Sequence, residues 1–143
     1  ILLLGFGIGI NSRFVESGKW TYEKQVSTFL KWYHLNKALL PRLIWREIPA
    51  QHFPTDTGMY DKFSTGIACK SLPLQNDTSL RESNWRNTIA DAIAGTYNIP
   101  VLKLWLLSAE RVDGHIGTDC THYCLPGIPD IWVAMLMQMV QSL

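Results

Sequence analysis

The sequence lacks several features that would assign it to a particular class of protein. Its 143 residues carry a formal net charge of only +1, with 13 basic and 12 acidic side chains. No basic stripe therefore indicates a nucleic-acid partner, and no acidic tail indicates a charged one. The chain also has no internal repeat and no low-complexity segment,. We expect one globular core and no nucleic acid as partner.

Long hydrophobic runs are also missing. The most apolar stretch, residues 1–10, is interrupted by glycines, and it falls well short of the roughly 20 residues that a membrane-spanning helix needs. It has neither a basic leader nor an Ala-x-Ala site, so it does not resemble an intact signal peptide. A buried strand explains it better. A chain that begins on a buried strand suggests a fragment, and a membrane anchor would then lie outside this chain.

Cysteine is scarce, and the number is odd: Cys69, Cys120 and Cys124. In an oxidising compartment one pair would close, leaving the third for another partner or as a free thiol. Pairing of Cys69 with Cys120 or Cys124 would tie a polar loop to the segment around residue 120, contributing about 3 to 4 kcal/mol. Asn76 opens a glycosylation sequon, Asn-Asp-Thr,. These features favour an oxidising lumen.

Apolar patterns alternate between those of strands and those of helices. Nearly continuous apolar runs predict strands at 1–10, 43–48 and 101–107,. Helical periodicity predicts helices at 21–40, 83–98 and from 129 to the end, with Thr21 and Ser83 as N-caps,. Residues 54–83 have no sustained period. This order predicts an α/β fold, a three-layer parallel sheet flanked by helices.

The predicted topology gathers the polar segments at one edge. In a parallel sheet all strands point the same way, so residues 7–11, 49–52 and 108–122 would emerge together after the strands. Open α/β sheets bind their ligands at this edge. We therefore expect one cleft there.

A glycine- and proline-rich loop at 113–132 concentrates carboxylates, imidazoles and thiols. Within it Asp119 and His122 are three residues apart, a spacing that places both side chains on one side of a turn. The carboxylate can accept the Nδ1 proton of the imidazole and leave Nε2 free as a general base. A nucleophile must come from elsewhere, because a base and its carboxylate perform no acyl chemistry alone.

Two other interpretations of this loop need no catalysis by the pair. Asp119 could cap a turn beside a surface histidine. Alternatively, Cys120, His122 and Cys124 alternate and could face one side as zinc ligands. No Cys-x-x-Cys or His-x-x-x-His partner completes a tetrahedral site, so we predict no metal site.

The run Asp-Cys-Thr-His-Tyr-Cys-Leu-Pro-Gly-Ile-Pro-Asp-Ile-Trp at 119–132, preceded by Arg-Val-Asp-Gly-His at 111–115, resembles the closing signature of the PC-esterase or trichome-birefringence-like family. These are polysaccharide O-acetyltransferases with an SGNH-hydrolase-like fold. The resemblance implies that Asp119 and His122 complete a triad whose serine lies in a Gly-Asp-Ser motif near the start of the domain. This chain contains no Gly-Asp-Ser. Residues 1–143 are therefore expected to be a single partial catalytic domain, its C-terminal portion, inactive alone.

The resemblance also suggests residues for the oxyanion hole or for substrate binding. Gly7 matches a glycine-containing turn beside the active site, although Gly5 stands where the family often has asparagine, and Asn11 is a substitute candidate. Arg46 and His52 match a stretch in which an arginine is followed by Pro-x-His-Phe or a close variant.

Without the resemblance, the same residues have simpler interpretations. Arg46 would pair with Glu47 or another carboxylate, and His52 would anchor a loop. His115 could orient substrate or hydrogen-bond its own loop. Trp132 leads the apolar stripe of the last helix and is expected to pack there rather than stack on sugar.

Together these features predict O-acyl transfer, with acetyl as the group, to hydroxyls of a polysaccharide or glycan. If water replaces the sugar, the same groups make a carbohydrate esterase, and a domain without its nucleophile would be a glycan-binding or structural module. We expect no bound cofactor and an acetyl donor, such as acetyl-CoA, as co-substrate. The expected location is the secretory pathway, in the Golgi lumen or membrane.

Overall fold

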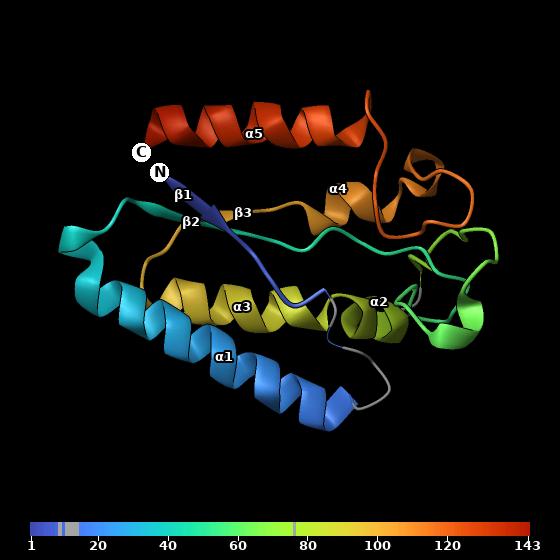
Figure 1. Cartoon of the computed structure of the whole chain (residues 1–143), viewed down its shortest axis with the longest axis horizontal. Helices are drawn as coiled ribbons and strands as arrows, with labels where there is room; N and C mark the ends of the chain where they lie inside the picture. The colour runs from blue at the N-terminus through green and yellow to red at the C-terminus, as the bar shows by residue number, and fades with distance from the viewer. Residues whose placement is uncertain (9, 11–14, 76) are drawn as a thin grey trace. The chain divides into compact units, whose positions relative to one another are not determined.

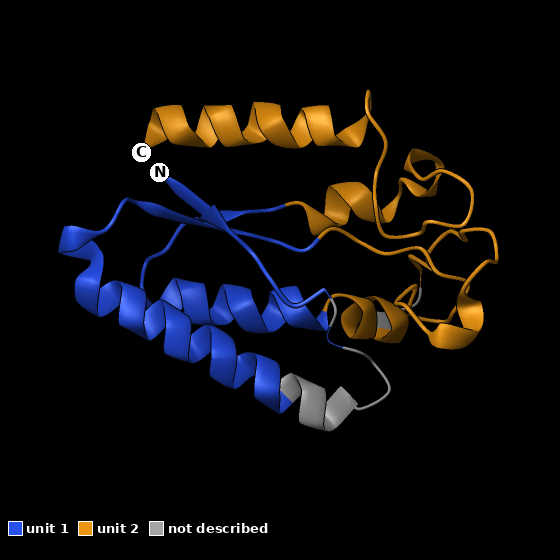
Figure 2. Ribbon diagram, viewed as in Figure 1, with its two compact units in different colours: residues 1–48, 85–103 blue, residues 49–84, 104–143 orange. Residues whose placement is uncertain are grey.

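The computed structural model describes residues 1–8, 10, 15–75 and 77–143 (Figure 1). These residues form two compact units, which are described in turn. Unit 1 contains residues 1–48 and 85–103, and unit 2 contains residues 49–84 and 104–143 (Figure 2). Among the described residues, no helix combines the length and the apolar character that crossing a membrane requires.

Unit 1 is built on a sheet of three parallel strands in the order β1-β2-β3. The strands are β1 (Leu2–Leu4), β2 (Leu43–Arg46) and β3 (Val101–Leu102). Leu3 lies opposite Ile44. The α/β class and the parallel sheet predicted from the sequence are confirmed.

Two helices connect the strands of unit 1. Helix α1 (Val15–Asn36) continues into the 3-10 turn η2 (Lys37–Leu39), and α3 (Trp85–Thr96) precedes β3. Both helices cover the same face of the sheet and pack on each other (Figure 1). The strand order β1-β2-β3 means that both connections, through α1 and through α3, advance in the same direction across the sheet. Two connections of the same hand then place their helices on the same face. Within unit 1 the fold thus has one sheet and one helical layer, and the three-layer form stays a prediction.

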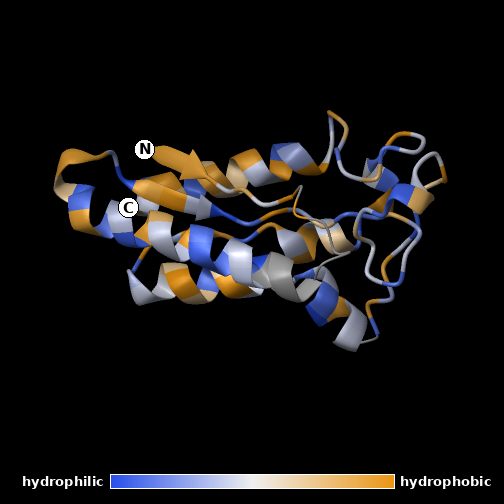
Figure 3. Cartoon of the chain, turned by 60° about the horizontal axis from the view of Figure 1, so that its bottom comes forward, coloured by the Kyte–Doolittle hydropathy of each residue, from blue (hydrophilic) through white to orange (hydrophobic). Residues whose placement is uncertain are grey.

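The core of unit 1 is formed by β2 and the buried face of α1. The three residues Leu43, Ile44 and Trp45 are each no more than 1% exposed. Helix α1 contributes residues at helical spacing, namely Tyr22, Val26, Leu30 and Tyr33,. Figure 3 shows the strands of this unit coloured mainly as hydrophobic, whereas the loops of unit 2 mix both kinds of residue. Burial of these apolar side chains therefore stabilises the sheet.

The structure corrects three sequence-based expectations in unit 1. Thr21 lies inside α1 and caps nothing, because the apolar face that identifies the helix begins only after its first turns. Strand β1 is not buried on both faces: Leu2 and Leu3 are 39% and 38% exposed, since β1 is an edge strand. The strand predicted at 101–107 ends at Leu102, because a short apolar run fits a strand and a helix equally well.

Unit 2 consists of short helices joined by long loops. Its elements are η3 (Lys62–Ser64), α2 (Asp77–Ser83), α4 (Trp105–Ala109), η4 (Val112–Gly114) and α5 (Ile128–Ser142). One hydrophobic cluster of unit 2 comprises Ala50, Leu72, Trp105 and Ala109, with Leu74 and Leu80 packed against them. Ser83 ends α2 rather than capping α3, so this prediction was wrong.

Helix α5 begins where the sequence predicts the last helix. The carboxylate of Asp130 accepts a hydrogen bond from the backbone N–H of Gly127 at 2.7 Å, and Pro129 occupies the first turn, where its missing N–H costs nothing,. The ring of Trp132 packs edge-on against Tyr123, with centroids 5.3 Å apart. Trp132 thus packs within its own unit, as expected.

Candidate active site

The Asp119–His122 pair lies in the loop between η4 and α5. Nδ1 of His122 is 2.8 Å from Oδ2 of Asp119 and 3.1 Å from Oδ1. The backbone N–H groups of Thr121 and His122 also donate to Oδ1, each at 3.1 Å. One carboxylate therefore both closes the turn and holds the imidazole, which combines two of the interpretations that the sequence allowed.

The environment of the pair suits a general base. Hydrogen bonds from the backbone and the ring of His122 hold the pKa of the Asp119 carboxyl below its usual range, so the carboxylate stays ionised,. The side chain of His122 is 82% exposed. Its Nε2 atom has no hydrogen-bond partner among residues 1–8, 10, 15–75 and 77–143. This nitrogen is oriented by the carboxylate and open to a reacting group.

Behind the pair, two more imidazoles form a continuous chain of hydrogen bonds. Nδ1 of His115 lies 2.7 Å from the carbonyl oxygen of His122, and Nε2 of His115 lies 2.8 Å from Nδ1 of His52. Nε2 of His52 lies 3.0 Å from the carbonyl oxygen of Ala109, at the end of α4. His52 is completely buried. Both histidines therefore act as loop anchors here, one of the two interpretations that the sequence allowed for each.

Tyr123 joins the segments around this chain, and sequence reasoning missed it. Its hydroxyl lies 2.9 Å from the carbonyl oxygen of Ala50 and 3.1 Å from that of Ser108. Burial raises the pKa of the Tyr123 phenol, so the group remains a hydrogen-bond donor,. The signal in the sequence that could have identified Tyr123 was its position between His122 and Cys124 in the signature run.

Ser108 fixes residue 50 from the other side. Its hydroxyl oxygen accepts from the backbone N–H of Ala50 at 2.8 Å. The hydroxyl proton points back to the start of α4, with the carbonyl oxygen of Trp105 at 2.8 Å. Ser108 is fully buried, so this hydrogen-bonded serine ties an irregular segment to a helix.

A disulfide clamps the same region. Cys69 is bonded to Cys120, with Cα atoms 5.3 Å apart, and Cys124 is free and half-buried. The backbone N–H of His52 donates to the carbonyl of Cys120 at 2.9 Å. The carbonyl of His52 accepts from the backbone N–H of Lys70 at 2.8 Å. The segments that carry Cys69 and Cys120 thus hold residue 52 between them, and we call this arrangement the clamp. The predicted tie between the polar loop and the Asp119 region is confirmed.

The disulfide also bears on the alternative of a zinc site. Cys120 cannot supply a thiolate while it is bonded to Cys69, which leaves only His122 and Cys124 of the three alternating candidates. In the part of the chain that the structure describes, no group of three histidine, cysteine or acidic side chains is arranged to hold a metal ion.

Arg46 ends β2 in unit 1. The sequence predicted an ion pair with Glu47 or another carboxylate, and the described residues show none between Arg46 and Glu47. The carboxylate of Glu47 instead lies 3.3 Å from Nζ of Lys103. Consecutive residues of an extended strand point to opposite faces, so the two side chains diverge. Burial lowers the pKa of the Arg46 guanidinium. Its role toward substrate stays a prediction.

Gly7 also lies in unit 1, and its backbone requires glycine. Its φ is +112°, and a Cβ atom there would lie 2.3 Å from the ring of Tyr22,. Close packing thus explains this glycine without catalysis, and its contribution to an oxyanion hole stays a prediction. Asn11 and Asn76 lie outside the described residues, so the predictions made for them remain as they were.

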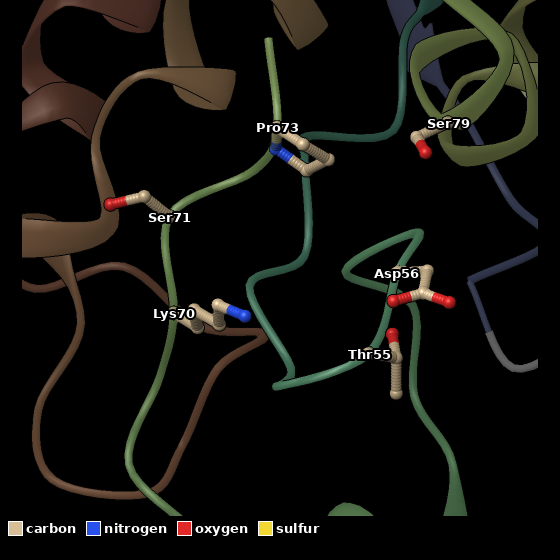
Figure 4. A pocket seen from close by; sticks show the side chains of 6 residues that line it. All are labelled: Thr55, Asp56, Lys70, Ser71, Pro73 and Ser79. Carbon is tan, nitrogen blue, oxygen red and sulfur yellow. The ribbon is translucent and has the colours of Figure 1, made fainter. Parts of the chain in front are cut away.

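A polar hollow of about 400 Å³ lies in unit 2, near the clamp. It is lined by Thr55, Asp56, Lys70, Ser71, Pro73 and Ser79. Figure 4 shows the ammonium of Lys70, the carboxylate of Asp56 and the hydroxyl of Thr55 facing this space. Such groups can hydrogen-bond the hydroxyls of a sugar. The same Lys70 donates its backbone N–H to His52, so the wall of the hollow is continuous with the clamp.

The parallel α/β sheet and the Asp-x-x-His pair before the last helix fit the class of SGNH-like acyl esterases and acyltransferases that the sequence predicts. Comparison with known proteins identifies the family. Residues 16–139 match PC-Esterase, described as a GDSL/SGNH-like acyl-esterase family found in Pmr5 and Cas1p. The chain belongs to the PC-esterase family, as its signature run indicated.

Named relatives come from plants. Trichome birefringence-like 7 of Arabidopsis thaliana is 37% identical over 71 residues, covering 43% of this chain and 16% of the relative. Protein trichome birefringence of the same plant is 27% identical over 138 residues, covering 80% and 22%. Xylan O-acetyltransferase 3 of Oryza sativa subsp. japonica is 33% identical over 88 residues, covering 61% and 18%. The chain spans less than a third of the length of each.

Proposed function

We propose that the protein containing this chain is an O-acetyltransferase that modifies hydroxyls of a polysaccharide. The observation that carries the proposal is the Asp119–His122 pair, in which the carboxylate holds Nδ1 and leaves an exposed Nε2, within a chain of the PC-esterase family. The polysaccharide acceptor is suggested by the relative named xylan O-acetyltransferase 3. The polar hollow beside the clamp offers groups suited to such an acceptor.

The first half of the proposed reaction acylates a serine. That serine belongs to polypeptide outside this chain, since the chain has no Gly-Asp-Ser. Nε2 of His122 takes the serine proton as the oxygen attacks the carbonyl carbon of the acetyl donor, and Asp119 stabilises the imidazolium that forms. The imidazolium then gives its proton to the leaving group, which is a thiol if the donor is acetyl-CoA. Backbone N–H groups near Gly7 are our candidates for the oxyanion hole.

The second half resolves the acetyl-enzyme. A sugar hydroxyl, with Arg46 as a candidate for binding the acceptor, loses its proton to Nε2 of His122 and attacks the acetyl carbon. The serine oxygen leaves and recovers that proton from His122, so the enzyme returns to its starting state. If water takes the place of the sugar, the same steps release acetate. The family's description as acyl esterases favours testing this esterase activity as the second candidate.

We also propose a location in the secretory pathway, in the Golgi lumen, with a membrane anchor outside this chain. The disulfide between Cys69 and Cys120 supports an oxidising compartment, because such bonds are rare in the cytosol,.

The test uses the full-length protein with an acetyl donor and xylan oligosaccharides. We expect His122→Ala to reduce transfer by at least about a thousandfold, and Asp119→Asn by about ten- to ten-thousandfold, because the imidazole loses its base function or its orientation. The side chain of His122 is 82% exposed, so His122→Ala should leave the unfolding temperature nearly unchanged. Asp119→Asn should lower it slightly, because the carboxylate also accepts two backbone N–H groups. Glu110→Gln, an exposed carboxylate of the same unit, is the matched control.

Mass analysis of the products separates the two candidate activities. Acetylated oligosaccharide identifies the transferase, and free acetate formed equally with and without acceptor identifies the esterase. Full transfer activity in a folded His122→Ala protein would remove the basis of the proposal.

A further inference from the structure

The His52–His115 contact has an unusual proton count. At one end of the chain the carbonyl of Ala109 can only accept, so Nε2 of His52 carries a hydrogen. At the other end the carbonyl of His122 can only accept, so Nδ1 of His115 carries one too. The two facing nitrogens, 2.8 Å apart, need a third hydrogen between them,. Two neutral imidazoles supply only two, and the complete chain therefore holds one extra proton.

We propose that His52 and His115 share one proton as a singly charged imidazole pair, and that this pair positions the general base His122 through its backbone carbonyl. The inference rests on the proposed function only for the catalytic role of His122. Asp119 orients the side chain of His122, and the pair holds the backbone of the same residue. The base is then fixed at two points, on ring and on main chain.

Tyr123 does not supply the missing hydrogen. Its hydroxyl lies 3.3 Å from Nδ1 of His52 but 2.9 Å from the carbonyl oxygen of Ala50. The hydroxyl has a single proton, and the shorter contact with an oxygen acceptor takes it. Without a shared proton, two lone pairs would face each other at 2.8 Å, or one carbonyl would lose its donor. Facing lone pairs repel each other, and loss of the donor to Ala109 would leave a buried carbonyl unpaired, so both changes cost stability,.

The charges around the pair act in both directions. Burial lowers the pKa of His52 and of His115, and repulsion between imidazoles adds to it. The carboxylates of Asp113 and Asp119 oppose this effect, and Asp113 is kept ionised by Arg111, which donates to it at 2.8 and 2.9 Å. Two coupled groups titrate as a unit. The pair therefore holds its proton at acid pH and releases it as the pH rises, which loosens the link to His122.

The decisive test measures protonation without using activity. In His115→Asn the amide nitrogen still reaches the carbonyl of His122, but the side chain is too short to reach His52. Site-resolved exchange of the imidazole C2 hydrogen, read by mass spectrometry on the full-length protein, gives the titration midpoint of His52. Loss of a shared proton should lower this midpoint by about one to two pKa units. If the two imidazoles merely repel each other, the midpoint of His52 should instead rise in His115→Asn, because the substitution removes a like charge.

Two further variants complete the exchange experiment. His52→Gln keeps a donor toward the carbonyl of Ala109 and removes the nitrogen that faces His115, so the midpoint of His115 should fall as well. Tyr123→Phe removes the competing hydroxyl and should leave the midpoint of His52 within a few tenths of a pKa unit. A rise or no change in the His52 midpoint of His115→Asn would overturn the proposal, and so would a large fall in Tyr123→Phe.

Kinetics test the positioning role. We expect His115→Asn to lower kcat about tenfold with little change in KM for the acceptor, because only the alignment of the base is affected. The dependence of kcat on pH should also weaken, since the variant no longer has a shared proton to lose. An unchanged kcat and pH profile would contradict the positioning role while His122→Ala still abolishes transfer. If the proposed function itself fails, no activity depends on His122, yet the exchange experiment still decides whether the proton is shared.

Discussion

Units 1 and 2 of this chain are held together by different kinds of interaction. In unit 1 the central strand β2 and the helix α1 bury large apolar side chains, among them Ile44 and Trp45, in regular structure. In unit 2 the fully buried positions include His52, Ser108 and the disulfide-bonded Cys120 beside apolar side chains such as Leu104 and Ile128. The comparison indicates that regular apolar packing organises unit 1, whereas unit 2 adds covalent and polar links to its apolar contacts and so shapes a site.

The largest expected loss of stability follows removal of the central aromatic side chain of unit 1. Trp45→Ala in the full-length protein should lower the free energy of unfolding by about 3 to 5 kcal/mol, because it leaves a cavity in the core. Trp45 is 1% exposed and Trp32 is 50% exposed, so Trp32→Ala is the control and should cost less than about 1 kcal/mol. Denaturant midpoints measure both. Equal losses would show that unit 1 does not depend on apolar burial.

The disulfide should dominate the stability of unit 2. The double variant Cys69→Ser with Cys120→Ser opens a link between residues 51 positions apart, which on the loop-entropy account is worth about 4 kcal/mol. Thermal unfolding measures the loss, and Cys124→Ser, which removes the free thiol, should have little effect. A double variant as stable as the parent would mean that the hydrogen bonds alone hold this unit.

A buried hydroxyl provides a finer test of the polar links. Ser108→Ala removes the acceptor for the backbone N–H of Ala50, and an unpaired buried donor costs about 1 to 3 kcal/mol. Ser142→Ala at the exposed end of α5 is the control and should be nearly neutral,. Equilibrium unfolding of both variants gives the values. A neutral Ser108→Ala would indicate that water or another group replaces the hydroxyl.

The smallest effect concerns two aspartates whose pKa values shift in opposite directions. In unit 1 burial raises the pKa of Asp91 from 3.8 to about 6, against the opposing effect of Lys103. The folded state therefore binds this proton more tightly, and its stabilising contribution, present at low pH, is lost as the pH rises from about 4 to about 6. In unit 2 the pKa of Asp119 is lowered, so its contribution is present at neutral pH and lost as the pH falls.

Stability against pH in the variants separates the two aspartates. Asp91→Asn should remove a decline of about 1 to 2 kcal/mol between pH 4 and 6, whereas Asp119→Asn should reduce the loss of stability in acid. If both variants changed the pH dependence with the same sign, the electrostatic contrast between the units would be wrong.

Most of unit 1 could be predicted from the sequence, because long periodic patterns determine its elements. The run 43–48 located β2, and the spacing of Tyr22, Val26 and Leu30 located α1,. The run 101–107 did not distinguish strand from helix: its first residues form β3, and Trp105 begins α4. A short apolar run lacks the length that would decide between the two periods.

In unit 2 the sequence predicted a contact between near neighbours and the cysteine tie, but not the contacts that depend on irregular backbone. The contact of Asp119 with His122 follows from their spacing, although its catalytic role stays a prediction. The contact between His52 and His115 joins residues 63 positions apart through irregular backbone, where no periodicity sets the direction of a side chain. For the same reason, the sequence could not decide whether Cys69 pairs with Cys120 or with Cys124.

The clamp on residue 52 links the assembly of the histidine chain to the redox state of the compartment. Oxidation of two thiols draws the Cys69 segment and the Cys120 segment to either side of His52. Before this bond closes, the covalent part of the hold on His52 is missing. In the oxidising compartment that we propose, closing this bond would complete the alignment of the histidine chain.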